Sequence, residues 1–593
     1  MKHLFRLFAI TLTCLPSILF GSHLMGGEIT WRCDGNGAFI FQAKLYRDCN
    51  GVNGPGGMIL QSNSPVTSIL CSLISQTDIS PQGIGCASCS IPMGLANSVE
   101  EFIYESAPIQ LNGTPPAGGW YFSYTDCCRN AVIANLSPGS GWFTLRAIMY
   151  PFSGQNTSPC FDNSPAFAEP PTIGLCTNSP LSYNHAAFDP DIDSLTYSWG
   201  VPLDGNGFPG TPYPYSPGYS FQSPLPGTAQ NPLNIPATLD TAQGIISFLS
   251  YTQGAFVTVT KVSSYKCGQL VAEIFREVQI ALLSNCLVSS SPNVYNTAPD
   301  MTPAPAVETF TLLAGDTFFY SFTASDFELL PVAAGGTPQV ITVEAMGMEL
   351  GLGDTSYTTG CLVPPCAVLS NPTPFSSPQQ LTESLTWPTS CAHAGFYNGC
   401  LQYQRNFQFI FRMDDNFCPA HGISIKSLNV FVTGPEVYAV GNSLAVSYPG
   451  VSIQWYLNGV PIPGATDTIY TPLQNGIYTI VATTSSGCSM LSNPVNRVLS
   501  GQQEIVSNES SFTIFPNPGM TNGVVNVLLR NVPTGSNLIR IYDVTGRLAK
   551  QFPIVINNEN EHLMLQLDDL KKGIYNISIN GKAGMLEQNL ILN

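Results

Sequence analysis

The sequence predicts an all-β protein, built as a string of β-sandwich domains that ends in a small C-terminal β-sandwich. Short runs in which apolar and polar residues alternate, such as residues 451–456, are typical of half-buried strands. The 53 glycines and 48 prolines divide the chain into many such runs, and no long stretch is rich in Ala, Glu, Lys and Leu as helical bundles are. The 593 residues exceed what one hydrophobic core holds, so several domains are expected.

The formal net charge of −17 reflects a shortage of basic residues, 21 Lys and Arg in all, more than runs of acids. A nucleic-acid partner requires a basic surface that neutralises phosphates. We therefore expect no nucleic-acid partner.

Residues 1–22 have the features of a secretory signal peptide. Lys2 and Arg6 accompany an apolar run at 7–20, and Gly21-Ser22 offers small residues for cleavage. The run is shorter than the roughly 20 residues that a bilayer-spanning helix needs, and no later run approaches that length. We expect a secreted protein, at the outer cell surface or extracellular, without a transmembrane helix once the signal is removed.

Cysteine usage points to disulfides, because 18 cysteines minus Cys14 in the signal leaves 17 in a chain exported to an oxidising space. Spacing leaves their connectivity open. The candidate pairs are neighbours in sequence: Cys33 with Cys49, Cys160 with Cys176, Cys267 with Cys286, and Cys361 with Cys366. Adjacent Cys127 and Cys128 are expected to bind different partners. Cys488, isolated in its region, is expected to be unpaired.

A compact module is visible near residue 455. The run Gln454-Trp-Tyr-Leu-Asn-Gly459 reads as a strand and a hairpin turn, and Ile462–Thr466, Gly476 and Tyr478 follow in order. This pattern resembles bacterial immunoglobulin-like modules. The resemblance implies a β-sandwich, although the strand before Trp455 has no cysteine for the disulfide that links the sheets of antibody domains.

Four motifs follow one another at the C-terminus. They are Pro516-Asn517-Pro518, then Ile541 to Arg547 with Gly546, then Gly573 and Tyr575, and a closing apolar strand at 585–592. Their order resembles the C-terminal sorting domain of cargo for the type IX secretion system of Bacteroidota.

This resemblance implies the type IX secretion machinery as a partner. It also implies removal of the domain, with anchoring to surface lipopolysaccharide or release of the mature protein. The closing strand lacks the Lys that often accompanies it in the family, which affects processing more than the route.

The region before the immunoglobulin-like module resembles large surface proteins of the same bacteria with cadherin-like modules. The shared motifs are Ser22–Ile29, Tyr46–Gly51, Cys127–Asn130, Asn163–Pro170, Asp189–Tyr197 and Gly244–Phe248. That group has no established biochemical activity. A weak internal repeat in the second part of this region predicts two sandwiches in succession.

The predicted organisation therefore has seven parts. They are a signal peptide at 1–22, a β-rich disulfide domain at 23–171, cadherin-like sandwiches at 172–290 and 291–434, an immunoglobulin-like domain at 435–500, a linker at 501–511 and the sorting domain at 512–593.

The acidic stretch Asp189, Asp191 and Asp193 is the candidate metal site. An EF-hand is excluded, because the sixth and twelfth positions counted from Asp189 are Ser194 and Gly200. The stretch resembles the DPDGDSLTY loop of cadherin-like modules, which implies calcium bound by carboxylate oxygens, with Ile192 replacing the usual Gly. The alternative is a solvated turn in which the Asp side chains cap backbone amides. Further candidate ligands are Asp326, Glu328, Asp414 and Asp415.

No catalytic residues are predicted, since the chain has no Gly-x-Ser-x-Gly elbow and no His-Glu-x-x-His motif. Cys86 and Cys89 have redox or zinc spacing, but structural disulfides are favoured. We expect no cofactor other than the candidate calcium, and a role in adhesion or surface structure with an unknown glycan or protein ligand. The alternative is a carbohydrate-binding protein or polysaccharide hydrolase. An exposed aromatic platform from Trp120, Tyr121 or Tyr213–Tyr215 would favour that alternative.

Overall fold

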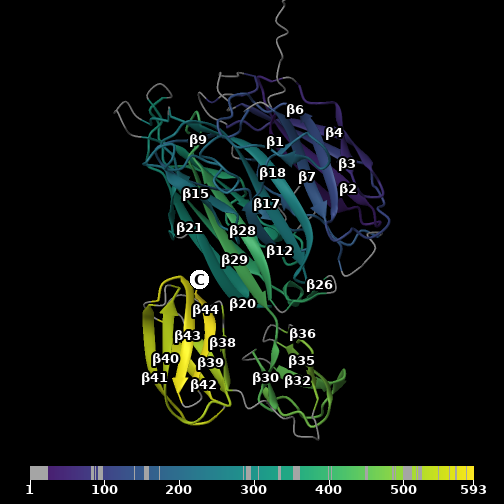
Figure 1. Ribbon diagram of the computed structural model, residues 1–593, viewed down its shortest axis with the longest axis vertical. Coiled ribbons are helices and arrows are strands. Elements are labelled where there is room, and N and C mark those ends of the chain that lie inside the picture. The colour runs from purple at the N-terminus through teal and green to yellow at the C-terminus, as the bar shows by residue number, and fades with distance from the viewer. Residues whose placement is uncertain are drawn as a thin grey trace, which may run out of the picture. The chain divides into compact units, whose positions relative to one another are not determined.

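The computed structural model describes residues 24–592 with short gaps (Figure 1). The gaps are 52, 82–85, 87, 91–97, 139–140, 153–158, 172–173, 285, 289–294, 305, 332–334, 351–360, 398–399, 403, 448–451, 484–486, 488, 499–509, 516, 518–523, 545–546, 560, 568–569 and 582–583. The predicted signal peptide lies outside the described residues. Contacts divide the chain into two compact units, one up to Arg497 and one formed by Val498–Asn593 with Leu473–Asn475.

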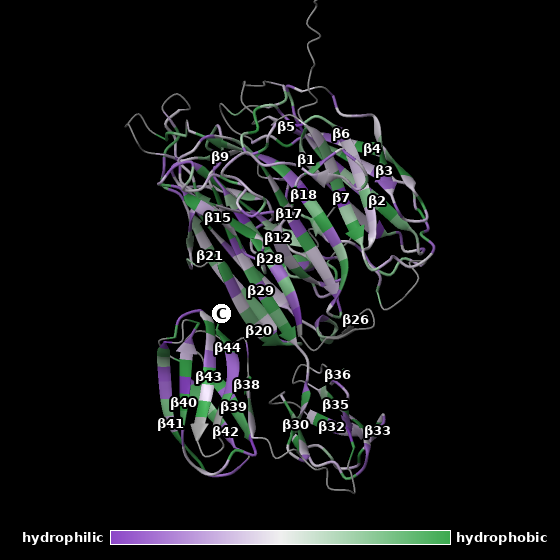
Figure 2. Cartoon of the chain, in the orientation of Figure 1, coloured by the Kyte–Doolittle hydropathy of each residue, from purple (hydrophilic) through white to green (hydrophobic). Residues whose placement is uncertain are grey.

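The all-β prediction is confirmed. In the described part of the chain, helix is confined to two three-residue 3-10 turns, Met348–Leu350 and Cys391–His393. Hydrophobic and hydrophilic residues alternate along many strands (Figure 2), as the two-faced geometry of a sheet requires.

The first seven strands form a sheet that curls until its two end strands meet the same edge of β18. The seven strands are β1 (Leu24–Cys33), β2 (Phe39–Asp48), β3 (Gly57–Ser62), β4 (Ser68–Asp78), β5 (Val99–Ser106), β6 (Trp120–Cys127) and β7 (Trp142–Met149), and β18 spans Gln269–Leu283. Their order is β1-β2-β5-β4-β3-β6-β7-β18, and β1 also pairs with β18. The enclosed core contains Trp31, Phe41, Tyr104 and Phe122.

The predicted domain boundary between residues 171 and 172 is wrong, because strands from both sides of it pair in this one sheet. β18 pairs with β7 at Ala272 and with β1 at Val278, while β17 (Gly254–Lys266) and β12 (Ser194–Trp199) extend the same sheet. The 15-residue β18 is long enough to serve two strands in turn along one edge. A Cβ on Gly26 would lie 1.9 Å from the Glu277 carbonyl oxygen, so glycine permits this closure.

A second, smaller sheet covers the region where β17 and β18 extend beyond the curled sheet. It contains β10 (Pro180–Asn184), β16 (Ile245–Leu249) and β15 (Ile235–Leu239). Tyr183, Ile246 and Phe248 from this sheet pack with Phe256 and Ile280. Residues 172–290 thus supply one sandwich layer of their own and share the other with the N-terminal strands. The remaining short strands are β8 (Ala166–Phe167), β9 (Gly174–Cys176), β11 (Ala187–Phe188), β13 (Leu203–Asp204) and β14 (Thr211–Pro212).

Residues 300–433 form a second sandwich. One sheet has the order β19 (Asp300–Thr302), β21 (Thr317–Ser325), β25 (Gln380–Pro388), β23 (Val368–Leu369). The other has the order β20 (Val307–Leu313), β29 (Ile423–Thr433), β28 (Gln404–Asp414), β22 (Val340–Met346), β24 (Phe375–Pro378), and β26 (Gly395–Tyr397) pairs with β27 (Cys400–Gln402) nearby in sequence. Phe322, Trp387 and Phe409 lie in the core between the two sheets.

Residues 437–497 form the module whose sequence resembles immunoglobulin-like modules. One sheet has the order β30 (Val437–Val440), β31 (Ser443–Val446), β34 (Ile469–Tyr470). The other sheet has the order β33 (Val460–Pro461), β32 (Ser452–Leu457), β35 (Gly476–Thr483), β36 (Ser489–Leu491), and β37 (Val495–Arg497) also pairs with β35. The predicted Asn458-Gly459 hairpin is confirmed, because Leu457 pairs with Val460. Both turn residues have positive φ, at 49° and 78°.

The second unit is a sandwich of its own. One sheet has the order β38 (Ser511–Phe515), β39 (Val524–Arg530), β42 (His562–Gln566). The other sheet has the order β41 (Leu548–Ile556), β40 (Gly535–Asp543), β43 (Gly573–Gly581), β44 (Gly584–Leu592). Val527, Leu565, Ile541 and Ile577 are fully or nearly fully buried between them.

Three of the four predicted disulfides are wrong. Cys361 pairs with Cys366, but Cys33 pairs with Cys160, Cys49 with Cys89, and Cys176 with Cys286, so Cys267 does not pair with Cys286. Strand pairing brings together cysteines that are far apart in sequence. For example, the backbone N–H of Cys160 donates to the Gly37 carbonyl, beside the end of β1.

Two further expectations about cysteines are corrected. Cys127 and Cys128 pair with each other, not with different partners. Among the described cysteines the unpaired one is the buried Cys71, whereas Cys488 lies outside the described residues. Cys86 pairs with Cys418, so a disulfide joins the N-terminal region to the second sandwich over a separation of 332 residues.

Candidate functional site

The acidic stretch lies between β11 and β12 and is buried. Asp189, Asp191 and Asp193 are 5%, 9% and 8% exposed, so a solvated turn is not what the chain forms. The carboxylate of Asp189 still caps backbone amides, since its Oδ1 accepts the N–H of Asp191 at 2.8 Å. Ile192 has a φ of 58° where the resembling modules have Gly, an unfavourable conformation for a β-branched residue.

The structure adds two residues to this stretch that sequence reasoning missed, Asp162 and Lys266. The Lys266 Nζ lies 3.0 Å from Asp162 Oδ1 and 2.8 Å from Asp193 Oδ2. All three side chains are at most 4% exposed. Asp162 comes from the loop after Cys160 and Lys266 ends β17, so no local motif marks their meeting.

Further hydrogen bonds hold the loops in place. Asp189 Oδ2 accepts the hydroxyl of Ser264 at 2.6 Å, which ties the acidic stretch to β17. Asp191 Oδ2 accepts the backbone N–H of Asn163 at 2.7 Å. Asp189 and Asp191 therefore each have a partner of their own, whereas Asp162 and Asp193 share Lys266. Three separate segments converge on one buried cluster, Asp162, Asp189, Asp191, Asp193 and Lys266, which we call the acidic cluster.

Burial and crowding set the protonation of the acidic cluster. Burial, with repulsion from the neighbouring carboxylates, raises the pKa of Asp162 and Asp189 well above the usual range. Burial also raises the pKa of Asp193. Burial disfavours the charged Lys266, but the surrounding carboxylates outweigh it and raise the pKa of its ammonium group. These shifts favour a charged Lys266 and the neutral form of the crowded carboxyls.

These residues fit calcium poorly. Oxygens of Asp162, Asp191 and Asp193 lie within 4.8 Å of one another, close enough to share an ion. Calcium takes six to eight oxygen ligands, however, and the Lys266 ammonium already contacts two of the three carboxylates. An ion would have to displace Lys266 from a site in which it is almost fully enclosed.

The other predicted acidic ligands have partners elsewhere. Asp326 Oδ1 accepts the N–H of Glu328 at 2.9 Å, and Glu328 accepts the Thr297 hydroxyl. Asp414 lies 2.9 Å from His421 Nδ1. Asp415 accepts three donors and is 1% exposed. They are not part of the acidic cluster.

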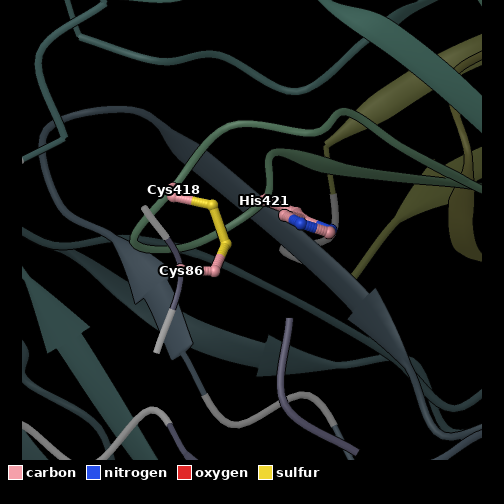
Figure 3. A group of neighbouring side chains, drawn as sticks. All are labelled: Cys86, Cys418 and His421. Atoms are coloured by element: carbon pink, nitrogen blue, oxygen red, sulfur yellow. A yellow bond between two sulfur atoms is a disulfide. The ribbon is translucent and has the colours of Figure 1, made fainter. Parts of the chain in front are cut away.

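A second group with metal-ligating residue types is Cys86, Cys418 and His421 (Figure 3). The two sulfur atoms form a disulfide and the imidazole lies beside it. Metal binding by cysteine requires a thiolate. Cys49 and Cys89, near Asp78, are likewise bonded to each other. Both groups are therefore structural.

A cavity of about 920 Å³ adjoins the acidic cluster in the first unit. One wall comes from residues 186–197 with Ala242 and Gln243, and the other from residues 346–349, 405–410 and 431–436. Gln243 spans the two walls, since its Oε1 accepts the side-chain N–H groups of Gln408 at 3.1 Å and Asn429 at 2.8 Å. The cavity thus lies between the first sandwich and the outer face of β28 and β29.

The aromatic residues whose exposure would favour a carbohydrate-binding protein do not form an exposed platform. Trp120 and Tyr213 are each 5% exposed, and Tyr121 and Tyr215 are partly buried. The Tyr213 hydroxyl donates to the Pro138 carbonyl at 2.8 Å. These rings are structural.

In the second unit, Asn517 ties the start of the domain to its closing strand. Its Nδ2 donates to the Asn589 carbonyl at 2.7 Å, and its Oδ1 accepts the N–H of Ile591 at 2.8 Å. Tyr575 is 8% exposed and donates to the Lys571 carbonyl at 2.6 Å, just before β43 begins at Gly573. Pro516, Pro518 and Gly546 lie outside the described residues.

Residues 513–593 match the family model described as the secretion system C-terminal sorting domain. The last domain is a sorting domain. Its presence implies secretion and contact with the type IX secretion machinery. No helix in the part of the chain that the structure describes is long and apolar enough to cross a membrane.

The matches to individual proteins are distant. The chain is 26% identical over 175 residues to integrin beta-like protein A of Dictyostelium discoideum, a match that spans 29% of this chain and 8% of that protein.

Among solved structures, a biofilm-associated protein BSP domain aligns over 96% of both chains at 8% identity and a TM-score of 0.17. A structure titled "Structural basis for Dscam isoform specificity" aligns with 72% of this chain and 99% of its own at 12% identity and a TM-score of 0.12. TM-scores this low do not indicate a shared fold.

Proposed function

We propose that this protein is exported by the type IX secretion system and acts at the outer cell surface in adhesion or as a structural surface component. The observation that carries the proposal is a sorting domain at the end of a string of β-sandwiches that are tied together by disulfides. Disulfides suit a folded chain exposed outside the cell.

The mature protein is held at the surface by lipopolysaccharide after the sorting domain is removed. Mass spectrometry of the cell-surface fraction tests this directly. We expect a chain that begins near residue 23, ends before residue 513 and carries a sugar lipid at its new C-terminus. An intact chain found in the periplasm would contradict the proposal.

The protein acts by binding and not by catalysis. The polar groups that sequence reasoning singled out serve structure, because Lys266 forms ion pairs with Asp162 and Asp193 inside the acidic cluster and the paired cysteines are disulfides. On this proposal it needs no metal ion, and a chelator should leave its melting curve unchanged. Hydrolysis of any polysaccharide by the purified chain would contradict the proposal.

A neutral glycan is the second candidate, as a ligand of the cavity. The cavity volume of about 920 Å³ lies within the roughly 300–1,000 Å³ that is usual for small-ligand pockets. Asn406, Gln408 and Gln243 supply amides that both donate and accept hydrogen bonds. The basic residue of the lining, Arg405, is 2% exposed, so acidic sugars find no exposed cation there.

A glycan array probed with the mature chain tests this candidate. Ser194 is exposed at the cavity wall, so Ser194→Arg should abolish binding by adding bulk and charge. Val368, 63% exposed on β23, is the matched control, and Val368→Arg should leave binding unchanged. Equal binding by both variants would place the ligand elsewhere.

A further inference from the structure

Lys266 occupies an environment that is unusual for a lysine. Its side chain is 2% exposed, and its Nζ contacts carboxyl groups from two different segments, Asp162 at 3.0 Å and Asp193 at 2.8 Å. These contacts are close in distance but are not aligned as hydrogen bonds. Lys261, on the same strand, differs: its partner at 2.7 Å is Glu273 alone, and it is 30% exposed.

The two carboxyls also lie next to each other. Oxygens of Asp162 and Asp193 are within 4.8 Å, and both side chains are 4% exposed. Two carboxyls that share a buried site do not both ionise readily, so one keeps its proton. The site therefore brings together a lysine ammonium, a carboxyl that favours its neutral form and a second carboxyl that can act as a base, all three side chains being at most 4% exposed.

We propose that Lys266 and Asp162 become joined by an intramolecular amide bond, an isopeptide, with Asp193 as the general acid and base. Lysine is a nucleophile only as the neutral amine, which a neighbouring base can generate by taking one proton. Holding the reacting groups together in a buried site replaces an encounter in solution with a reaction within one molecule.

The reaction balances without a co-reactant. Asp193 takes one proton from the Lys266 ammonium, and the freed Nζ attacks Cγ of the protonated Asp162 carboxyl. The new C–N bond forms and the C–OH bond breaks, so the hydroxyl leaves as water with a second proton from nitrogen that Asp193 relays. The products are a neutral amide, one water and a protonated Asp193.

Asp162 is assigned as the electrophile because it lies among three other aspartates and on a loop that is held in place. Burial and three neighbouring aspartates raise its pKa well above the usual range, while contact with Lys266 opposes this. Its loop is also fixed, since the Asp162 carbonyl accepts the Trp31 indole N–H at 3.3 Å and Cys160 is bonded to Cys33.

The bond would tie the loop after the curled sheet to the end of β17, a separation of 104 residues (266 minus 162). Unlike the disulfides, it withstands reducing agents. It therefore complements a role at the cell surface, although it does not depend on that role.

Mass spectrometry of the reduced, denatured mature chain tests the proposal. We expect a mass one water lower than the sequence predicts, and a tryptic product in which residues 147–261 are linked to the Lys266 peptide, with no cleavage after Lys266. Because residues 147–261 contain both Asp162 and Asp193, fragmentation of the linked product should place the bond at Asp162. Asp162→Ala and Lys266→Met should each restore the full mass.

Asp193→Asn keeps the shape of the acidic cluster and removes the base, so it should also restore the full mass. Lys261→Met is the matched control and should retain the dehydrated, linked form. A wild-type chain at full mass with free Asp162 and Lys266 peptides would overturn the proposal. A link from Lys266 to Asp193 would overturn the assignment of Asp162 as the electrophile.

Discussion

At the scale of single residues, buried ionisable groups shape this protein more than exposed ones do. Asp415 is an example outside the acidic cluster. Its carboxyl accepts the Phe417 and Gly422 amides and the Asn296 side chain, yet burial raises its pKa from 3.8 to about 7. The folded chain therefore binds a proton that the unfolded chain releases.

This shift predicts a pH dependence of stability. Between pH 4 and 7 the unfolded state has lost the Asp415 proton and the folded state keeps it, so stability falls as pH rises, by about 1.4 kcal/mol per pKa unit. The contribution is fully present below pH 3.8 and is lost above about pH 7. Asp415→Asn should flatten this part of the profile of melting temperature against pH.

The exposed Asp467 provides the control for that measurement. Asp467→Asn should follow the wild-type profile from pH 4 to 8. Parallel profiles for wild type and Asp415→Asn would show that Asp415 does not carry the predicted shift.

At the scale of elements, the closure of the first sheet depends on one position in β1. Because a Cβ on Gly26 would meet the Glu277 carbonyl, Gly26→Ala should separate β1 from β18. We expect a loss of several kcal/mol in unfolding free energy, since backbone cannot move aside as a flexible side chain can. A Cβ added at Gly56 would have open space around it, so Gly56→Ala should change the free energy of unfolding by less than about 0.5 kcal/mol. Urea titration of both variants measures the two effects.

In the immunoglobulin-like module, Trp455 is the central packing element. It is fully buried, and its indole N–H donates to the Asp467 carbonyl at 2.8 Å. Trp455→Ala should cost about 3–5 kcal/mol within the module. Hydrogen exchange should then accelerate in β32 and β35.

Tyr438, 43% exposed on β30, is the comparison. Tyr438→Ala should leave the exchange of β32 and β35 unchanged. Equal acceleration by both variants would show that Trp455 does not carry the packing of the module.

At the scale of the whole molecule, export is separable from the rest of the chain. The sorting domain forms its own unit with its own core. Deletion of residues 512–593 should leave the protein in the periplasm, as measured by fractionation and immunoblotting. Deletion of the immunoglobulin-like module, residues 435–500, should not prevent delivery to the surface. Normal surface delivery without residues 512–593 would contradict the assigned route.

The sequence by itself determined the features that depend on local patterns. Strand alternation predicts the β class, Asn458-Gly459 predicts its hairpin, and the C-terminal motifs predict the sorting domain. The cysteines of the Cys361–Cys366 pair are close enough in the chain to meet without long-range folding.

Only the tertiary structure decided which distant segments meet. β18 joins strands that the sequence pattern assigns to two domains, Cys33 pairs across 127 residues with Cys160, and Lys266 contacts an acidic stretch more than 70 residues away. Pairing of this kind is set by the register of long strands and by burial, and neither leaves a local trace. For that reason the candidate metal loop became, in the folded chain, a buried cluster whose cation is a lysine.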